Sequence, residues 1–213
     1  MNRSPLVGVL VATGSLLAGY ALFLRRWQLE WGATNEESGG PLPGDELIAS
    51  PDLTATRAIT VRASVDRVWP WVAQLGQGRG GLYSYDFLEN LVGCDIHSAD
   101  RIVPEWQGVA VGDEVRLAPE VGLEVGLVEP RHALVLHGAV STGESRTPQP
   151  YDFTWAYVLR DGPDNATRLI VRERYAYTRR WAPLLVEPIE LVSFVMTQKM
   201  LRGIRVRAER ALH

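Results

Sequence analysis

Cysteine is almost absent from this sequence of 213 residues, which contains Cys94 alone. One cysteine cannot form an intramolecular disulfide, so no disulfide is expected and nothing in the sequence records an oxidising compartment. Internal repeats and low-complexity blocks are also lacking. The hydrophobic content of 46% fits one ordinary domain with an appendage and is enough for a sizeable core.

Basic residues are outnumbered by acidic ones after the first 26 positions. Arg3, Arg25 and Arg26 lie in that opening stretch, which has no acidic residue, while the remainder carries 19 basic against 25 acidic residues, a formal net charge of −6. An acidic domain repels a phosphate backbone, so we expect no nucleic-acid partner.

Charge is missing altogether from Leu6 to Leu24, a run of 19 residues. At about 1.5 Å per residue, a helix of that length spans roughly 28 Å, close to the hydrocarbon core of a bilayer. Arg25, Arg26 and Trp27 follow and suit the headgroup layer, whereas a signal peptide has a shorter apolar core and a small-residue cleavage site. Residues 1–26 are therefore predicted to form an uncleaved, single-pass membrane anchor. The arginines after the span outnumber those before it, which favours a cytoplasmic main domain.

The stretch from Gly32 to Pro51 is rich in glycine, proline and acidic residues and has no sustained apolar period. This composition predicts that residues 27–53 form a semi-extended juxtamembrane linker. Within it, Leu47 and Ile48 are the residues suited to dock on the domain.

Residues 54–213 are predicted to form the folded domain, which opens with a strand from Thr54 to Val61. A helix follows from Val65 to Leu75, with Ser64 as its N-cap. A second short helix is predicted from Ser84 to Leu91, with Tyr85, Leu88 and Leu91 on one face. Strands separated by turn residues come next, and their short connections favour antiparallel pairing. These strands are 114–117, 123–128, 133–140, 153–160 and 167–177. A long amphipathic helix from Pro183 to Leu212 closes the chain.

Several segments resemble a known superfamily: ATRAITV, then VDRVWPWVAQLGQGRGGLYSYDFLENLVG, HSADRIVPEW, the strand VGDEVRL and the aromatic strand FTWAYVL. Together they resemble the SRPBCC superfamily, which includes the START and birch-pollen-allergen-like proteins and the polyketide cyclase and dehydrase types. The resemblance implies an α+β helix-grip fold, in which a curved antiparallel sheet wraps a long C-terminal helix around an apolar cavity. Members bind lipids, sterols, polyketides or other apolar molecules, and some are cyclases or hydrolases.

Strand alternation predicts the walls of such a cavity. Trp155 and Tyr157 share one face of their strand, as do Glu173 and Tyr175 on the next strand. Met196 and Met200 lie on the closing helix and adapt to irregular shapes, although plain core packing explains all these side chains equally well. Glu173 would be an inward carboxylate that needs a partner, so it is either a structural acid or a group that orients a ligand.

The segment from Gly76 to Trp106 holds the densest polar and aromatic side chains. Its GxGxxG pattern follows a helix instead of a strand, so we reject dinucleotide binding and expect the glycines to allow a tight turn. Arg79 is predicted at the rim of the cavity, where Tyr83, Tyr85 and Trp106 would line the entrance.

The same segment contains Asp95, His97 and Asp100, with Cys94 and Glu105 nearby. Their spacing matches no strong metal-site signature. Cys94 and His97 are three positions apart in a loop, which is no evidence for a nucleophile and base that face each other. We expect neither a metal nor a cofactor.

Together these patterns predict a membrane-anchored domain that binds a hydrophobic small molecule or lipid in an internal cavity. The first alternative is a cyclase, dehydrase or hydrolase in which Glu173, Tyr85, Asp86 or His97 performs acid–base work. The second alternative is an interaction module with a filled core.

Overall fold

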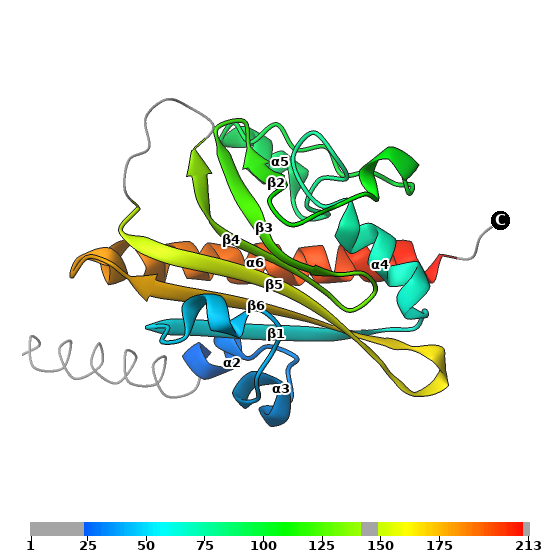
Figure 1. The fold of residues 1–213 in the computed structure, drawn as a ribbon, viewed down its shortest axis with the longest axis horizontal. Helices are drawn as coiled ribbons and strands as arrows, with labels where there is room; N and C mark the ends of the chain where they lie inside the picture. Colours follow the sequence, from blue (N-terminus) through cyan, green and yellow to red (C-terminus); the bar gives the residue numbers. More distant parts are fainter. Residues whose placement is uncertain (1–23, 142–148, 211–213) are drawn as a thin grey trace, which may run out of the picture.

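The computed structural model describes residues 24–141 and 149–210, and it has the predicted α+β class (Figure 1). Residues 1–23, which hold nearly all of the predicted membrane anchor, lie outside these ranges. Within the described ranges, no helix is both long and apolar enough to cross a membrane.

An antiparallel sheet of six strands forms the centre of the fold, in the order β1-β6-β5-β4-β3-β2. Neighbours in the chain pair with one another except at the edge, where β1 pairs with β6, because the chain returns to its first strand before the last helix. The strands are β1 (Leu53–Val61), β2 (Glu114–Ala118), β3 (Val121–Glu129), β4 (Ala133–Ser141), β5 (Tyr151–Asp161) and β6 (Thr167–Tyr177).

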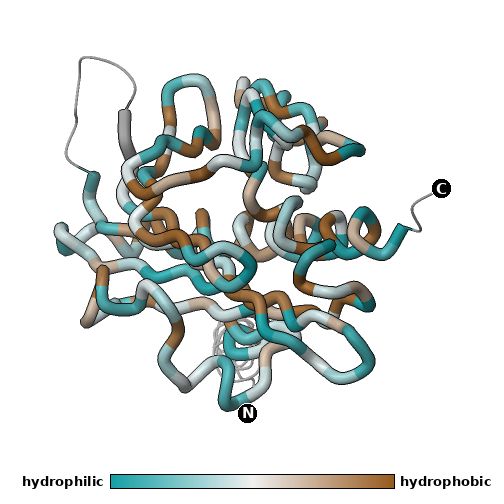
Figure 2. The backbone as a smooth tube through the Cα atoms, turned by 45° about the vertical axis from the view of Figure 1, so that its right-hand side comes forward, coloured by the Kyte–Doolittle hydropathy of each residue, from teal (hydrophilic) through white to brown (hydrophobic). Residues whose placement is uncertain are grey.

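One long helix, α6 (Ala182–Glu209), runs along one face of this sheet, and the shorter α4 (Val65–Ala73) packs near its C-terminal half (Figure 1). The arrangement is the predicted helix-grip fold. The alternating apolar residues of β5 and β6 point toward α6, and the brown stretches of Figure 2 follow the strands and this helix. Tyr157, Leu159, Leu169 and Val171 belong to the same buried cluster as Met200 and Ile204 of α6, so the inward faces predicted from strand alternation are correct.

The segment that precedes β1 contains α2 (Arg25–Leu29), α3 (Asn35–Gly39) and the 3-10 helix η2 (Asp45–Ile48). Helix α2 packs beside β1 against α6, whereas α3 and η2 lie on the outer face of the sheet. Leu42 is buried against Ala58, Val158 and Ile170, which are outward-facing residues of β1, β5 and β6. This part of the chain is therefore folded onto the sheet and is not semi-extended as expected, while the juxtamembrane role of residues 27–53 stays a prediction.

Ion pairs hold this N-terminal segment in place. Glu37 pairs with Arg168 at 2.7 Å, and Asp45 pairs with both Arg172 and Arg174 at 2.6 Å. Composition alone predicted a linker because acidic and glycine-rich stretches usually lack apolar partners, but here the acids match three outward arginines of β6.

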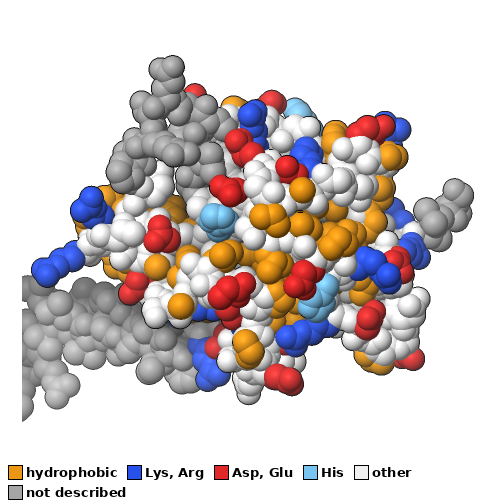
Figure 3. All heavy atoms as spheres, in the orientation of Figure 1, with side chains coloured by type: hydrophobic (Ala, Val, Ile, Leu, Met, Phe, Trp, Pro, Cys, Tyr) orange, Lys and Arg blue, Asp and Glu red, His pale blue; other side chains and the backbone are white. Residues whose placement is uncertain are grey.

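Around the segment, charged side chains of both signs surround a central band of hydrophobic ones on the face that Figure 3 shows. Positive and negative side chains are therefore interspersed on this face.

The short helices lie in the connections: α5 (Asp86–Leu91), η3 (Pro104–Trp106) and η4 (Pro163–Asn165). Helix α5 is the element whose faces the sequence analysis assigned incorrectly. Phe87 and Leu91 are 77% and 73% exposed, whereas Glu89 is 6% exposed. The sequence placed Tyr85, Leu88 and Leu91 on one apolar face of α5, but all three side chains are exposed and the fold buries Glu89 instead.

Candidate functional site

A largely apolar cavity of about 210 Å³ lies between the sheet and the N-terminal half of α6. Its walls come from the last strands, from the β2–β3 hairpin and from the helix. The lining residues are Leu117, Val121, Leu123, Tyr151, Phe153, Trp155, Tyr175, Ile189 and Ser193.

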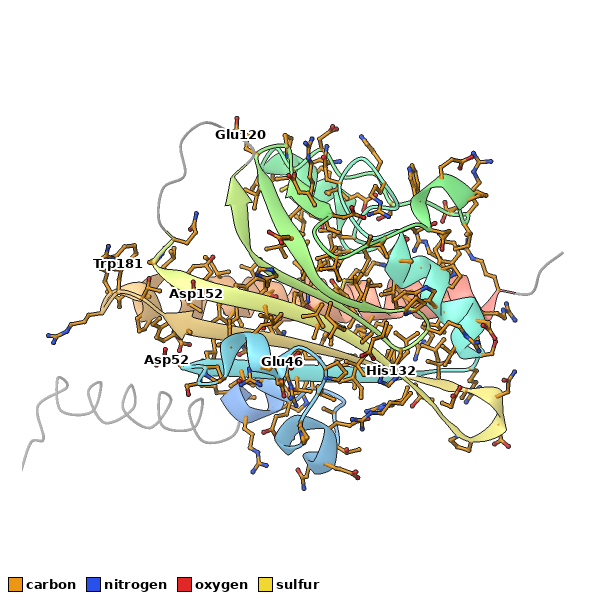
Figure 4. All side chains as sticks on the ribbon, in the orientation of Figure 1. Glu46, Asp52, Glu120, His132, Asp152 and Trp181 are labelled. Atoms are coloured by element: carbon orange, nitrogen blue, oxygen red, sulfur yellow. The ribbon has the colours of Figure 1, made fainter. Side chains whose placement is uncertain are left out.

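The cavity lies at the end of the domain away from α4. Figure 4 places Trp181, which caps α6, and Asp152 of β5 at that end. Along the same stripe of α6, Ile189 is 39% exposed, while Met200 and Ile204 are 1% and 0% exposed. This stripe of α6 is therefore buried in the hydrophobic core at its C-terminal end and forms a partly exposed wall of the cavity at its N-terminal end.

Behind the cavity wall, Glu173 accepts hydrogen bonds from four side chains. Tyr175 Oη donates to Glu173 Oε2 at 3.1 Å, and Ser193 Oγ donates to Glu173 Oε1 at 2.8 Å. Arg57 Nη1 and Thr197 Oγ1 each donate to Glu173 Oε1 at 3.1 Å. Because Tyr175 and Ser193 also line the cavity, this carboxylate fixes two of the cavity walls.

A second carboxylate, Glu190, completes the buried cluster. It is fully buried on α6 and receives hydrogen bonds from Arg57 and Gln28. Burial raises the pKa of Glu190; the nearby Arg57 guanidinium opposes that shift, and the negative charge of Glu173 adds to it. Arg57 thus holds two acids at once, and its guanidinium also lies 5.3 Å from the centre of the Phe194 ring.

The predicted ligand-binding residues divide into two groups. Trp155 and Tyr175 line the large cavity. Met196 and Met200 line a smaller space of about 40 Å³ next to it, which also touches Trp155 and Ser193. Tyr157 is buried in the core, with its hydroxyl 3.6 Å from Met200 Sδ. The binding roles of these residues stay predictions.

The second group comes from the Gly76–Trp106 segment and consists of Arg79, Tyr83, Tyr85 and Trp106. None of these four residues lines either of the two spaces. Arg79 Nη2 donates to the backbone oxygens of Ala73 and Trp106, at 3.0 and 2.5 Å, and burial lowers the pKa of its guanidinium. Tyr83 is buried edge-on against Trp71, and Tyr85 lies at the surface beneath Lys199. Arg79 therefore joins the end of α4 to the loop at Trp106 by hydrogen bonds, although the sequence predicted it at the rim of the cavity.

The glycines of that segment do make the tight turn that was predicted. Gly76 and Gly81 exchange backbone hydrogen bonds of 3.0 and 2.9 Å, and both have positive φ. A Cβ on Gly81 would lie 2.9 Å from the backbone oxygen of His97, so a larger residue does not fit there.

The remaining polar groups of the segment do not form a reactive centre. His97 and Asp95 have side chains that are 80% and 66% exposed, and Asp86 accepts hydrogen bonds from Ser98. Burial and the charge of Glu89 raise the pKa of the Cys94 thiol, which disfavours the thiolate form that a nucleophile needs. Across residues 24–141 and 149–210, no group of three potential metal ligands is found.

The sequence analysis missed three buried charged residues that lie in or beside the cavity: Arg57, Glu89 and Glu190. Arg57 shares the inward alternation of Ile59 and Val61, and Glu190 lies four residues from both Val186 and Phe194, so each could have been found from periodicity. Periodicity gave no indication that Glu89 is buried, because Leu88 and Leu91 belonged to the predicted apolar face of α5.

Comparison with known proteins gives likenesses of fold only. The sequence matches no protein-family model and no curated protein. Among solved structures, truncated norcoclaurine synthase from Thalictrum flavum aligns over 75% of this chain and 95% of its own, with 14% identity and a TM-score of 0.48.

Two further structures align at similar levels. Protein jhp0584 from Helicobacter pylori covers 79% of this chain and 95% of its own, with 12% identity and a TM-score of 0.48. CalU16 from Micromonospora echinospora covers 73% and 83%, with 16% identity and a TM-score of 0.35. At these values the likenesses carry no argument about ligand or reaction.

Proposed function

We propose that this protein is a membrane-attached member of the SRPBCC superfamily that binds a hydrophobic small molecule or lipid between its sheet and α6. The observation that supports this function is the aromatic-walled cavity of about 210 Å³. Ligand sites are typically concave and mostly apolar, with a few polar groups at defined positions. A cavity of this kind also favours ligand binding over an interaction module with a filled core.

The buried polar cluster supports the same proposal. Side chains around an apolar cavity tend to move into it when they can repack, because this lowers the free-energy cost of the empty volume. Here the hydrogen bonds of Glu173 to Tyr175 and Ser193 restrain two walls from the sheet and the helix. The cavity is therefore preorganised for an occupant, which lowers the entropic cost of binding.

The contacts of α2 support membrane attachment beside this cavity. The Trp27 ring packs edge-on against Phe194 of α6, with ring centres 5.3 Å apart, and Arg25 Nη2 donates to Glu187 Oε1 at 2.7 Å. These contacts place the start of the described chain next to the N-terminal half of α6. An anchor at Leu6–Leu24, with the domain on its cytoplasmic side, would bring this half of the helix close to the bilayer.

Exposed apolar side chains on the same half of α6 fit that location. They are Leu184, Leu191, Val192 and Val195. Such residues are favourable in contact with lipid and costly in water, so the protein would take up its ligand from the bilayer through this end.

A cavity-filling substitution tests the binding function. Val121 lines the cavity and is partly exposed, so Val121→Trp should fill the mouth without disturbing the core. Val111→Trp is the matched control, because Val111 is exposed and is not among the lining residues. We expect Val121→Trp to weaken binding of a fluorescent apolar probe by about tenfold or more, a loss of about 1.4 kcal/mol, and Val111→Trp to leave it unchanged.

Native mass spectrometry of the gently extracted full chain provides the complementary measurement. A bound hydrophobic molecule that the probe displaces would support the proposal. Protein that repeatedly emerges empty and binds no displaceable probe would refute it.

Membrane attachment has a separate test. Deleting residues 1–23 retains Arg25 and Trp27, which contact α6, and should move the protein out of the membrane fraction. Recovery of the shortened protein in the membrane fraction, with the domain still folded by circular dichroism, would show that Leu6–Leu24 is not the anchor.

A further inference from the structure

A small space next to the main cavity contains polar groups in its wall. The volume of this space is about 40 Å³, above the roughly 10–15 Å³ that admits a single water molecule. Trp155 and Ser193 line both spaces, so the small one extends the large one toward α5. Most of its other walls are apolar, including Leu82, Met196 and Met200.

Glu89 of α5 forms one wall of this space, and its carboxyl group is buried although the apolar side chains of the same helix are exposed. Helix α5 exposes Phe87 and Leu91 and buries Glu89 instead. Glu89 Oε2 is buried and has no hydrogen-bond partner among the described residues. Buried acids are normally paired, because desolvation without a hydrogen bond is costly, so this oxygen is an acceptor that awaits a donor.

Trp155 contributes a second unpaired group. Its indole Nε1 is buried without a partner within the described part of the chain, although the N–H of a buried tryptophan usually finds an acceptor. Other polar side chains of the small space are already engaged. Ser193 and Thr197 donate to Glu173, and Ser84 Oγ donates to the backbone oxygen of Met196 at 3.1 Å. One acceptor and one donor are therefore left.

We propose that Glu89 and Trp155 form a polar subsite at the inner end of the cavity, and that this subsite takes the hydroxyl group of an otherwise apolar alcohol or phenol. The proposal rests on the ligand-binding function proposed above. A hydroxyl donates one hydrogen bond and accepts others, so it satisfies the carboxylate and the indole N–H together.

Other polar groups fit this pair less well. A hydrocarbon leaves both buried atoms unpaired, and an ammonium group can donate to Glu89 but cannot accept from the Trp155 N–H. A carboxylate or phosphate would bring a second negative charge beside Glu89 in a space with little solvent. The small volume also limits the polar end of the ligand to a group about the size of a hydroxyl and its carbon.

The electrostatic surroundings of Glu89 are consistent with this role. Burial, followed by the charge of Asp86, raises the pKa of Glu89 to about 7. Both protonation states of the carboxyl group are accessible near neutral pH. Each has an oxygen that accepts a hydrogen bond from a hydroxyl, so the subsite keeps its partner in either state.

Two ligands of matched shape test the subsite: 2-naphthol and 2-methylnaphthalene, in which a methyl group replaces the hydroxyl. Binding is measured on the full chain in detergent by displacement of the apolar probe. Partition into detergent is the same for every variant and cancels when variants are compared. We expect the ratio of the two dissociation constants to change by about tenfold in Glu89→Leu, as 2-naphthol weakens while 2-methylnaphthalene does not.

Three variants complete the design. Trp155→Phe removes the donor and should lower the preference for 2-naphthol in the same direction, whereas Glu89→Gln keeps an acceptor and the shape and should retain most of it. Glu105→Leu, at an exposed acid outside both spaces, should leave the preference unchanged.

The outcomes separate the two proposals. If neither ligand displaces the probe from the wild-type protein, the binding function itself fails. If both displace it but Glu89→Leu and Trp155→Phe keep the wild-type preference, the cavity stands and the hydroxyl subsite is refuted.

Discussion

The two halves of α6 pack against the same sheet in different ways. In the C-terminal half, Met200 and Ile204 are fully buried in the cluster that α4 and the strands complete. In the N-terminal half, Ile189 lines an open cavity, and the charged cluster of Arg57, Glu173 and Glu190 lies behind it. One half is therefore a filled hydrophobic core, and the other is a restrained apolar surface that is partly exposed.

The difference shows how one fold supplies both stability and a cavity. Close packing against α4 stabilises the C-terminal half through burial alone. The N-terminal half of α6 is not closely packed against another helix in this way, and hydrogen bonds hold the walls of its cavity in place instead. A buried ionic cluster adds little net stability, but removing or displacing one of its members leaves an unpaired buried charge and is strongly destabilising. The cluster therefore holds the cavity wall in one conformation.

The largest effect is expected from breaking the charged cluster. Arg57→Met leaves Glu173 and Glu190 buried without their shared cation and should cost about 3–5 kcal/mol of unfolding free energy. The control is Arg26→Met, because Arg26 forms an exposed i,i+4 pair with Glu30 that contributes about 0.3–0.5 kcal/mol. Urea unfolding measures both. Equal losses would show that the cluster does not hold the cavity end.

Matched truncations compare the two halves of α6 directly. Ile204→Ala removes a fully buried side chain and should cost about 2–5 kcal/mol. Ile189→Ala removes the same atoms from the cavity wall and should cost less than about 1 kcal/mol, while it weakens binding of the apolar probe. If both variants lose the same stability, the cavity end is as well packed as the core.

A smaller effect is expected on the outer face of the sheet. Asp45→Asn weakens the ion pairs with the buried Arg172 and with Arg174, and should cost about 1–3 kcal/mol. Limited proteolysis should then cut residues 33–51 faster, while probe binding stays unchanged because the cavity lies on the opposite face. Glu46→Gln is the control, since Glu46 is an exposed acid on the same 3-10 helix (Figure 4). Faster cleavage in both variants would point to a general charge effect.

The last effect concerns pH. Because burial and Asp86 raise the pKa of Glu89 from 4.5 to about 7, the folded state holds this proton more tightly than the unfolded state does. The contribution of Glu89 is fully present below about pH 4.5 and is lost as pH rises through about 7, at up to about 1.4 kcal/mol per pH unit. Urea unfolding at pH 5 and pH 7.5 should show a smaller decline in Glu89→Gln than in the wild type. Identical declines would contradict a raised pKa.

Much of the fold followed from patterns that depend on local chemistry. The strand from Thr167 to Tyr177 was predicted with its bounds, and the helices at Val65 and Pro183 began within one residue of their predicted starts. Alternation also placed Glu173 and Tyr175 on the inward face correctly. Period and turn residues are intrinsic to the chain, so these predictions did not need the partners.

The candidate site was harder to predict because its members come from distant segments. The aromatic strand and the methionines of α6 were found, but Arg57, Glu190 and Glu89 were not. Of the residues expected at the entrance, Arg79 instead connects two loops by hydrogen bonds, Tyr83 is buried in the core and Tyr85 lies at the surface. A sequence pattern gives the face of an element, but it does not give the element that covers that face.

For this protein, the sequence by itself determined the order of strands and helices, the inward aromatic stripe and the acidic character of the domain. Only the tertiary structure decided that α3 and η2 cover the outer face of the sheet, that α5 buries Glu89 in place of its leucines, and that one half of α6 is open. Local periodicity records which residues avoid water, whereas the choice among competing apolar and charged partners is made by the packing of the whole chain.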